Sequence, residues 1–310
     1  MLPQALAVIQ GKGGVGKTSC TAALSGLFAA AGRRVLAVDI DPQANLGRDL
    51  GYYDEVDARG DGGRALLGAL HGYPVEPIHN VRPNLDCVSA GDATEELTHM
   101  LTSREMRRPG SAQTAIADAL TPLARDYDLI LIDCPPSSPL LQKATLSAVQ
   151  YVLIPTRADD ASIDGLLKVD SLFAEVKGAG VNPSLHLLGA FLFGVGAQSK
   201  RISDDARQAI ADCLGGDKHV LHTQIRYAEG AAQDCRRLGL LPHELEAKLP
   251  EANRARFAAL RARRAGGGRH RADGDTRISG SAAGLAQDYS KLAQEVVARI
   301  RVHRQAQVSA

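Results

Sequence analysis

Patterns of buried strands and patterns of helices alternate along most of the chain. Apolar runs lie within 6–9, 34–39 and 128–133, and the first helix is expected over Thr21–Ala31, just before Gly32. Strands that alternate with helices form parallel βα units. The chain is therefore expected to be an α/β protein with a doubly wound, mostly parallel sheet and helices on both faces.

The remaining elements follow the same rhythm. The segment between 51 and 84 gives a weak signal because glycine and proline are abundant, and only a short helix at Arg64–Leu70 is expected there. Further strands are expected at 85–89, 151–156, 187–193 and 220–226. Further helices are expected at 94–106, about 112–125, from 162, through 233–237 and over 281–296.

A glycine-rich turn lies between the first expected strand and the first expected helix. Residues 11–18 satisfy G-x-x-x-x-G-K-[ST], in which backbone N–H groups and a helix N-terminus hold phosphate oxygens. Lys17 is expected to reach the β- and γ-phosphates of a nucleoside triphosphate, and the Thr18 hydroxyl to ligate Mg²⁺. The expected nucleotide-binding residues of this P-loop are Gly11, Gly13, Gly14, Val15, Gly16, Lys17, Thr18 and Ser19.

Three aspartates stand at or just after the ends of expected strands. They are Asp39, Asp41 and Asp133. Ligands of open α/β sheets bind outside the carboxyl ends of the strands, so these side chains are expected beside the P-loop. Carboxylates are poor neighbours for phosphate unless a metal ion or water separates them. Asp133 is therefore expected to hold the Mg²⁺ shell, with a plain strand-end aspartate as the alternative.

Composition and charge narrow the class of protein. The chain has 310 residues, of which 45% are hydrophobic and 23% are charged, as in ordinary soluble proteins. A formal net charge of +1 gives no global argument for nucleic acid. The five cysteines are scattered without C-x-x-C spacing, which favours reduced thiols. No apolar run approaches the roughly 20 residues that span a bilayer, so a cytoplasmic protein is expected.

The P-loop carries an additional lysine. The string 12–18, Lys-Gly-Gly-Val-Gly-Lys-Thr, resembles the deviant phosphate loop of the ParA/MinD family of ATPases. In that family the first lysine crosses a dimer interface to the nucleotide of the partner subunit, which implies this catalytic role for Lys12. A solvated surface lysine is the alternative.

Two further strings support the resemblance. Residues 39–45 resemble the family segment D-x-D-P-Q-x-N, which implies that Asp41 orients the attacking water and that Asp39 supports the hydrated Mg²⁺. Residues 133–137 resemble the family's second switch, D-x-P-P-S. The strand that ends at Pro155 resembles the segment that passes the nucleotide base. The adenine contacts stay open, because Gly194–Gln198 departs from the asparagine or threonine-rich turn of many relatives.

The resemblance covers most of residues 1–243 and 281–300, and it implies a function. A ParA-type ATPase binds ATP and Mg²⁺, closes into a homodimer, and binds DNA without sequence preference. Hydrolysis stimulated by a ParB-like partner then releases the DNA, which drives plasmid or chromosome partition on the nucleoid. The expected DNA contacts are Lys200, Arg201, Arg226, Arg236 and Arg237.

An apparent insertion lies at about 244–280 within the one expected ATPase domain. Its first part could be helical, but arginines crowd around Gly266–Gly268 and apolar residues are few, so a mobile segment is expected. A basic arm on DNA phosphates and a solvated loop are both open interpretations.

Two other functions of the same fold stay open. A MinD-like positioning ATPase on a membrane is favoured slightly by Gly11-Lys12, but the tail 299–310 lacks the aromatic or leucine face of a membrane-binding helix, so no membrane contact is expected. A redox or iron–sulfur carrier ATPase would need paired cysteines at a dimer axis, and no such pair is apparent in the sequence.

Overall fold

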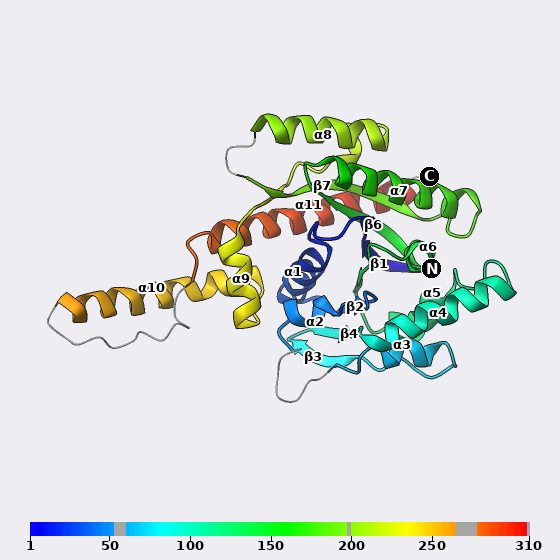
Figure 1. The fold of residues 1–310 in the computed structure, drawn as a ribbon, viewed down its shortest axis with the longest axis horizontal. Coiled ribbons are helices and arrows are strands. Elements are labelled where there is room, and N and C mark those ends of the chain that lie inside the picture. The colour runs from blue at the N-terminus through cyan, green and yellow to red at the C-terminus, as the bar shows by residue number, and fades with distance from the viewer. Residues whose placement is uncertain (53–59, 197–199, 265–277, 309–310) are drawn as a thin grey trace.

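One eight-stranded sheet forms the middle layer of the protein (Figure 1). The computed structural model describes residues 1–52, 60–196, 200–264 and 278–308. The strand order is β3-β4-β2-β5-β1-β6-β7-β8, and every pair is parallel except β3 with β4. The strands are β1 (Leu2–Val8), β2 (Val35–Asp39), β3 (Ile78–Arg82), β4 (Leu85–Val88), β5 (Leu129–Asp133), β6 (Val149–Thr156), β7 (His186–Val195) and β8 (Ile225–Arg226).

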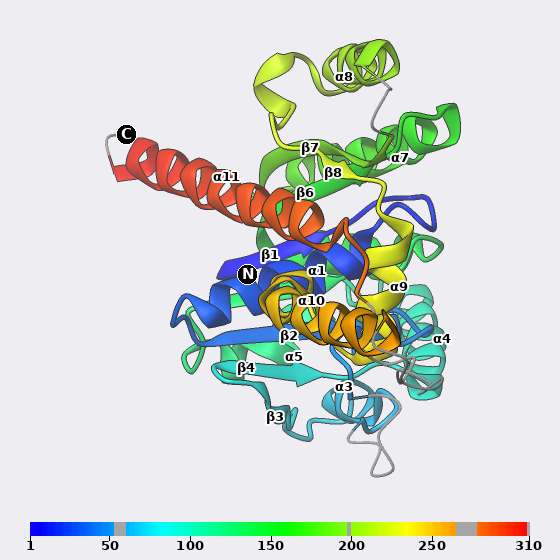
Figure 2. The same cartoon turned by 90° about the vertical axis from the view of Figure 1, so that its left-hand side faces the viewer.

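Helices cover both faces of the sheet, so the expected doubly wound α/β fold is confirmed (Figures 1 and 2). The central strand β1 shows why the apolar runs are continuous: Ala5 and Ala7 face one core, Leu6 and Val8 face the other, and all are buried. One face carries α3 (Arg64–Ala69), α4 (Asp92–Arg107), α5 (Ala115–Ala124), α6 (Pro139–Ala148), α7 (Asp160–Gly178) and α8 (Lys200–Leu214). The other face carries α1 (Lys17–Ala30), α2 (Asn45–Asp49), α9 (Glu229–Leu238), α10 (Pro242–Arg264) and α11 (Ala282–Val308).

The edge strand β3 was not expected from the sequence. It lies in the segment of weak signal, pairs only with β4 among the described strands, and exposes His79 and Asn80. Asn80 also has a positive φ of 54°, which interrupts the regular alternation. A short exposed edge strand lacks the apolar pattern by which the buried strands are recognised.

Most of the strand expected at 220–226 does not form, and a side chain takes over part of its backbone hydrogen bonding. Only Ile225–Arg226 form β8, and Val220 makes an isolated bridge to Ala190. Between them the backbone N–H groups of His222 and Thr223 donate to Glu295 of α11, at 2.8 and 2.9 Å. A carboxylate thus takes the place of a neighbouring strand.

The first part of the expected insertion is a regular helix. The sequence had left this open, since it indicated only that this part could be helical. Helix α10 runs from Pro242 to Arg264 and packs against α9 and α11 (Figure 2). Leu245 is fully buried and anchors the first turns of α10 to the core. The exposed segment therefore begins after Leu245 rather than at about 244. From Asn253 to Ala258 every described side chain is exposed. Residues 265–277 of the expected insertion, which include Gly266–Gly268, lie outside the described residues.

None of the described helices is both long and apolar enough to cross a membrane.

Candidate nucleotide-binding site

The P-loop connects β1 to α1 at the carboxyl edge of the sheet. Gly14 and Gly16 have positive φ angles of 73° and 86°, and Gly16 precedes the first residue of α1. A Cβ added at Gly16 would lie 2.3 Å from the Phe193 ring, so only glycine fits. Val15 is buried below the loop, while Gly13 is exposed above it. The geometry leaves backbone N–H groups at a helix N-terminus, where anions bind favourably.

Lys17 lies inside the loop and is only 6% exposed. Its Nζ donates to the Lys12 carbonyl oxygen at 3.0 Å. Burial lowers the pKa of Lys17, and the nearby Asp133 and Asp41 carboxylates partly oppose that shift. The loop thus holds an ammonium group, paired with a neutral carbonyl, at the place where phosphate charge is expected.

Asp39 and Asp133 stand side by side at the ends of β2 and β5, where they are partners in the strand register. Both are buried. Burial raises the pKa of Asp133 to about 7, while the Thr18 hydroxyl and Lys17 lower it. Neither oxygen of Asp133 makes a hydrogen bond within the described residues. Burial, and then the charge of Asp133, raise the pKa of Asp39 well above its ordinary value.

An unsatisfied buried carboxylate requires a physical explanation. In the described part of the chain, Asp133 has no hydrogen-bond donor, and its carboxylate faces the Thr18 hydroxyl beside the phosphate loop. Asp39 instead accepts from the backbone N–H groups of Asp41 and Leu46, at 2.9 and 3.1 Å. Oxygen donors of this kind suit Mg²⁺, so Thr18 and Asp133 fit a bound magnesium ion.

Asp41 lies outside this buried pair and is partly exposed. Its Oδ1 accepts from the backbone N–H of Gln43 at 3.1 Å. Together with Pro135 and Pro136 it lines a cavity of about 370 Å³ that α4 closes on the far side. The two segments expected to act as switches therefore face each other beside the loop.

Lys12 is held within its own chain. Its Nζ lies 2.6 Å from Oδ1 of Asp159, which caps α7 by accepting from the backbone N–H of Ser162 at 2.9 Å. Arg157 adds a weaker contact with the other Asp159 oxygen at 3.9 Å. Neither Lys12 nor Asp159 is fully exposed. The lysine is therefore positioned by α7 rather than solvated.

Gln10 positions the loop, a role that the sequence interpretation missed. It is fully buried, and its Nε2 contacts the carbonyls of Pro155 and Ser162 at 3.3 and 3.2 Å. Its Oε1 accepts from the backbone N–H of Gly11 at 2.7 Å. Gln10 therefore fixes the start of the loop against β6 and α7. Pro155 lies behind the loop as one of these partners.

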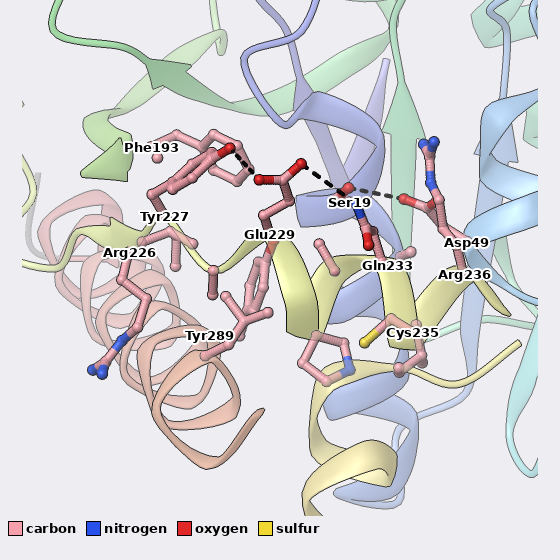
Figure 3. Close-up of a pocket in the computed structure, with 18 of the residues that line it drawn as sticks. Ser19, Asp49, Phe193, Arg226, Tyr227, Glu229, Gln233, Cys235, Arg236 and Tyr289 are labelled. Atoms are coloured by element: carbon pink, nitrogen blue, oxygen red, sulfur yellow. Dashed lines mark hydrogen bonds and ion pairs between the residues drawn. The ribbon is translucent and has the colours of Figure 1, made fainter. Parts of the chain in front are cut away.

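A cavity of about 350 Å³ opens beside the first turn of α1 (Figure 3). Ser19 lies at its loop end, and the Phe193 and Tyr227 rings form part of its wall. Glu229 accepts from the Tyr227 hydroxyl at 2.9 Å, and Gln233 reaches the same carboxylate at 3.4 Å. The cavity is large enough for a planar organic group. Pro155, the residue expected near a nucleotide base, does not line it.

The five expected DNA contacts separate into two groups. Lys200 and Arg201 begin α8 and are exposed, Arg201 by 94% of its side chain. Arg201 makes only a long contact of 3.9 Å with Asp205, whereas the other three form closer ion pairs: Arg226 with Asp288 at 2.7 Å, Arg236 with Asp49 at 3.0 Å and Arg237 with Asp234 at 3.0 Å.

The family of the protein follows from sequence comparison. A family model described as an AAA domain matches residues 3–187, which is more than half of the chain. The chromosome-partitioning ATPase Soj of Treponema pallidum is 32% identical over 224 residues, which cover 71% of this chain and 81% of Soj. This chain belongs to the ParA/Soj family. The chromosome partitioning protein ParA of Myxococcus xanthus is 36% identical over 182 residues, covering 58% of this chain and only 61% of the Myxococcus protein.

Solved structures agree with the fold. The ATP complex of a McdA variant from Cyanothece superposes with a TM-score of 0.66 at 22% identity, covering 79% of this chain and 90% of McdA. Cobyrinic acid a,c-diamide synthase from Mycobacterium smegmatis, bound to an ATP analogue and magnesium, has a TM-score of 0.56 at 28% identity and covers 68% and 80% of the two chains. Members of this fold thus bind ATP or an ATP analogue, in one case with magnesium.

The family assignment supports the partitioning ATPase that the sequence indicated first. All five cysteines are free, and the described residues contain no group of three or more histidine, cysteine or acidic side chains that could hold a metal ion. Cys134, which follows Asp133, is buried against Thr145, and burial raises the pKa of its thiol to about 12. It has the character of a structural thiol rather than a ligand.

Proposed function

We propose that this protein is a partition ATPase that uses ATP as the switch for DNA attachment. Mg²⁺ and ATP bind at the P-loop, two copies of the chain close into a homodimer, and the dimer binds DNA without sequence preference. Hydrolysis, stimulated by a ParB-like protein, returns the monomer. The observation that carries the proposal is the buried, unsatisfied carboxylate of Asp133 next to Thr18 and Lys17.

Each polar group at the loop has a role in this proposal. Lys17 neutralises β- and γ-phosphate charge, and the loop N–H groups bind the phosphate oxygens. Thr18 and Asp133 would hold Mg²⁺, which would supply positive charge that offsets the phosphate charge. Asp41, at the partly exposed switch, orients the attacking water. Asp39 fixes the switch backbone through Asp41 and Leu46.

The cavity beside Ser19 is the proposed site of the nucleotide base. It continues from the first turn of α1, and its Phe193 and Tyr227 rings offer faces on which a base can stack. Gln233 and Glu229 supply polar groups at its wall. The base is thus proposed to lie on the α9 side of the loop, whereas Pro155 supports the loop from the α7 side through Gln10.

Lys12 is the proposed link between nucleotide and dimer. In the monomer its charge is balanced by Asp159. Exchange of this partly exposed pair costs little, because exposed ion pairs contribute roughly 0–1 kcal/mol. A triphosphate of a second copy offers more negative charge than one carboxylate. Lys12 can therefore leave Asp159 when the dimer closes.

Two described surfaces are available to DNA phosphates. Lys200 and Arg201 extend from α8, and the exposed half of α10 presents Arg254, Phe257 and Arg261 on one side at spacings of three and four residues. Backbone contacts by basic side chains need no base recognition. Arg226, Arg236 and Arg237 can contact DNA only if their ion pairs break, so they are weaker candidates for DNA contacts than these two surfaces.

Retention on nonspecific DNA tests the proposal. Wild type is compared with Lys12→Ala and Asp41→Ala, each with Mg²⁺ and ATP or ADP. We expect wild type to be retained with ATP only, Lys12→Ala never to be retained, and Asp41→Ala to persist on DNA because hydrolysis is blocked. Retention that is the same with ATP and with ADP, or the same for all three proteins, would contradict the ATP switch.

A further inference from the structure

One carboxylate connects the helices α1, α2 and α9. Asp49, the last residue of α2, accepts from the Ser19 hydroxyl through Oδ2 at 2.9 Å. Its Oδ1 accepts from Nε of Arg236 on α9 at 3.0 Å. Figure 3 shows the three side chains meeting at the edge of the cavity beside α1. Three elements that are distant in sequence therefore converge on one buried side chain.

The position of Asp49 is unusual for a negative charge. Its side chain is only 9% exposed, and it lines the cavity that adjoins the phosphate loop. Ser19 follows Thr18 directly, in the first turn of α1. Arg236 balances the carboxylate but is itself 57% exposed, so solvent weakens that compensation. An incoming phosphate group thus meets an anion next to its own binding loop.

The Ser19 hydroxyl has one proton to donate. In the structure that proton is directed to Asp49. A phosphate oxygen in the loop is a second anionic acceptor for the same donor, and the two acceptors cannot be satisfied at full strength together. The like charges of phosphate and carboxylate also repel each other across the cavity edge.

We propose that Asp49 is a positioning residue that restrains nucleotide affinity by competing with nucleotide phosphate for the Ser19 hydroxyl. Arg236 sets the strength of this restraint, because it balances the charge of Asp49. The inference rests on the proposed placement of ATP in the P-loop. It assigns to Arg236 a role at the nucleotide site, in place of the expected contact with DNA.

Calorimetric titration with Mg²⁺–ATP and Mg²⁺–ADP tests the inference through two variants with opposite expected effects. Asp49→Asn keeps the shape and a weak acceptor but removes the charge, so we expect nucleotide to bind about threefold to tenfold tighter. Arg236→Gln leaves Asp49 unbalanced, so we expect about threefold weaker binding. A loss of structure alone would weaken binding in both variants.

The matched control is Asp234→Asn. Asp234 also lies on α9 and pairs with an arginine, Arg237, but it does not line the cavity. Its replacement is expected to leave nucleotide affinity within about twofold of wild type, because solvent and salt screen a charge that does not line the cavity. Circular dichroism checks that each variant is folded.

A double-mutant cycle with Ser19→Ala tests whether the hydroxyl is the point of competition, and Arg236→Gln, which leaves Asp49 in place, tests the restraint independently of Asp49→Asn. Ser19→Ala removes the shared donor. If the hydroxyl is the point of competition, Asp49→Asn tightens binding less in the Ser19→Ala background than in wild type. Tightening of the same size in both backgrounds would overturn the competition for the hydroxyl.

The outcomes separate this inference from the proposed function. Equal nucleotide affinity of wild type, Asp49→Asn and Arg236→Gln would overturn the inference while the ATP switch stands. Changes of the same sign in the two variants would overturn it as well. Failure of wild type to bind Mg²⁺–ATP at all would overturn both.

Discussion

The carboxyl edge of the sheet and the C-terminal helices use buried charge in opposite ways. At the edge, Asp133 is buried without a hydrogen-bond donor in the described structure, and its pKa is raised to about 7. On α11, Asp288 is nearly as buried but accepts from the backbone N–H and the guanidinium of Arg226. The comparison indicates that a paired carboxylate stabilises the fold, whereas an unpaired one is held ready for a ligand.

The largest effect is expected from Lys17→Ala. The loop would lose its buried cation, and charge-assisted contacts to phosphate contribute about 3 kcal/mol, so nucleotide affinity is expected to fall about 100-fold or more. Folding should suffer little, because burial already disfavours the ammonium in the free protein. Calorimetric titration and thermal denaturation measure the two quantities. An unchanged ATP affinity would show that the loop is not the phosphate site.

Asp288→Asn tests the paired side of the comparison. Breaking a partly buried, bidentate ion pair leaves Arg226 without its acceptor, so we expect a loss of about 2–3 kcal/mol of unfolding free energy. Urea denaturation at neutral pH measures it. Nucleotide affinity should stay near that of wild type. A stability equal to wild type would remove the distinction between the two regions.

Asp133→Asn tests the unpaired carboxylate, and its expected effect on the unfolding free energy has the opposite sign to that of Asp288→Asn. The free protein is expected to gain about 1 kcal/mol at pH 8, because a buried carboxylate without a partner is replaced by a neutral amide. The same variant should lose the extra stabilisation that Mg²⁺–ATP gives to wild type. Urea denaturation with and without Mg²⁺–ATP provides both values. Destabilisation of the free protein equal to that of Asp288→Asn would contradict the comparison.

Much of the candidate nucleotide site at the carboxyl edge of the sheet could be predicted from the sequence, because its polar residues lie in short continuous segments. The P-loop and Asp41 follow strands of recognisable apolar pattern, Asp39 and Asp133 end such strands, and the structure brings them to one edge. The strands that carry these residues are largely buried, so their apolar pattern is clear.

The supporting residues could not be predicted because their partners are distant in sequence. Lys12 meets Asp159 across 147 residues, and Ser19 meets Asp49 across 30. Such contacts depend on the order of strands in the sheet, and no local pattern encodes that order. The N–H groups of His222 and Thr223 were assigned to a strand for the same reason, since their acceptor Glu295 lies on α11.

A smaller effect is expected at the opposite edge of the sheet, where the rings of His186 and His303 stack 3.8 Å apart. Burial, and then the nearby His303, Lys177, His219 and Arg299, lower the pKa of His186 to about 4. The folded pKa lies below the unfolded one, so this stability is present above about pH 6.5 and is lost as the pH falls towards 4.

Replacement of His186 provides the measurement. His186→Gln is expected to flatten the decline of unfolding free energy between pH 6.5 and 4 by on the order of 1 kcal/mol, a value reduced for the partial exposure of the pair. Urea denaturation at several pH values compares it with wild type. Parallel pH profiles of the two proteins would show that the histidine stack does not titrate as inferred.

The smallest effect on folding is expected from Arg201→Gln. Its side chain is 94% exposed and lies 3.9 Å from Asp205, so the unfolding free energy should change by less than about 0.5 kcal/mol. Any loss of retention on DNA can then be assigned to a lost contact. A destabilisation of the size expected for Asp288→Asn would place Arg201 among the structural ion pairs instead.

Sedimentation velocity of wild type and Lys12→Ala tests the central claim most directly. The claim is that ATP in the P-loop draws Lys12 from Asp159 to a second copy of the chain. We predict that wild type changes from monomer to dimer with Mg²⁺–ATP but not with Mg²⁺–ADP, and that Lys12→Ala binds ATP yet stays monomeric. An ATP-dependent dimer of Lys12→Ala, or a wild type whose mass ignores ATP, would contradict it.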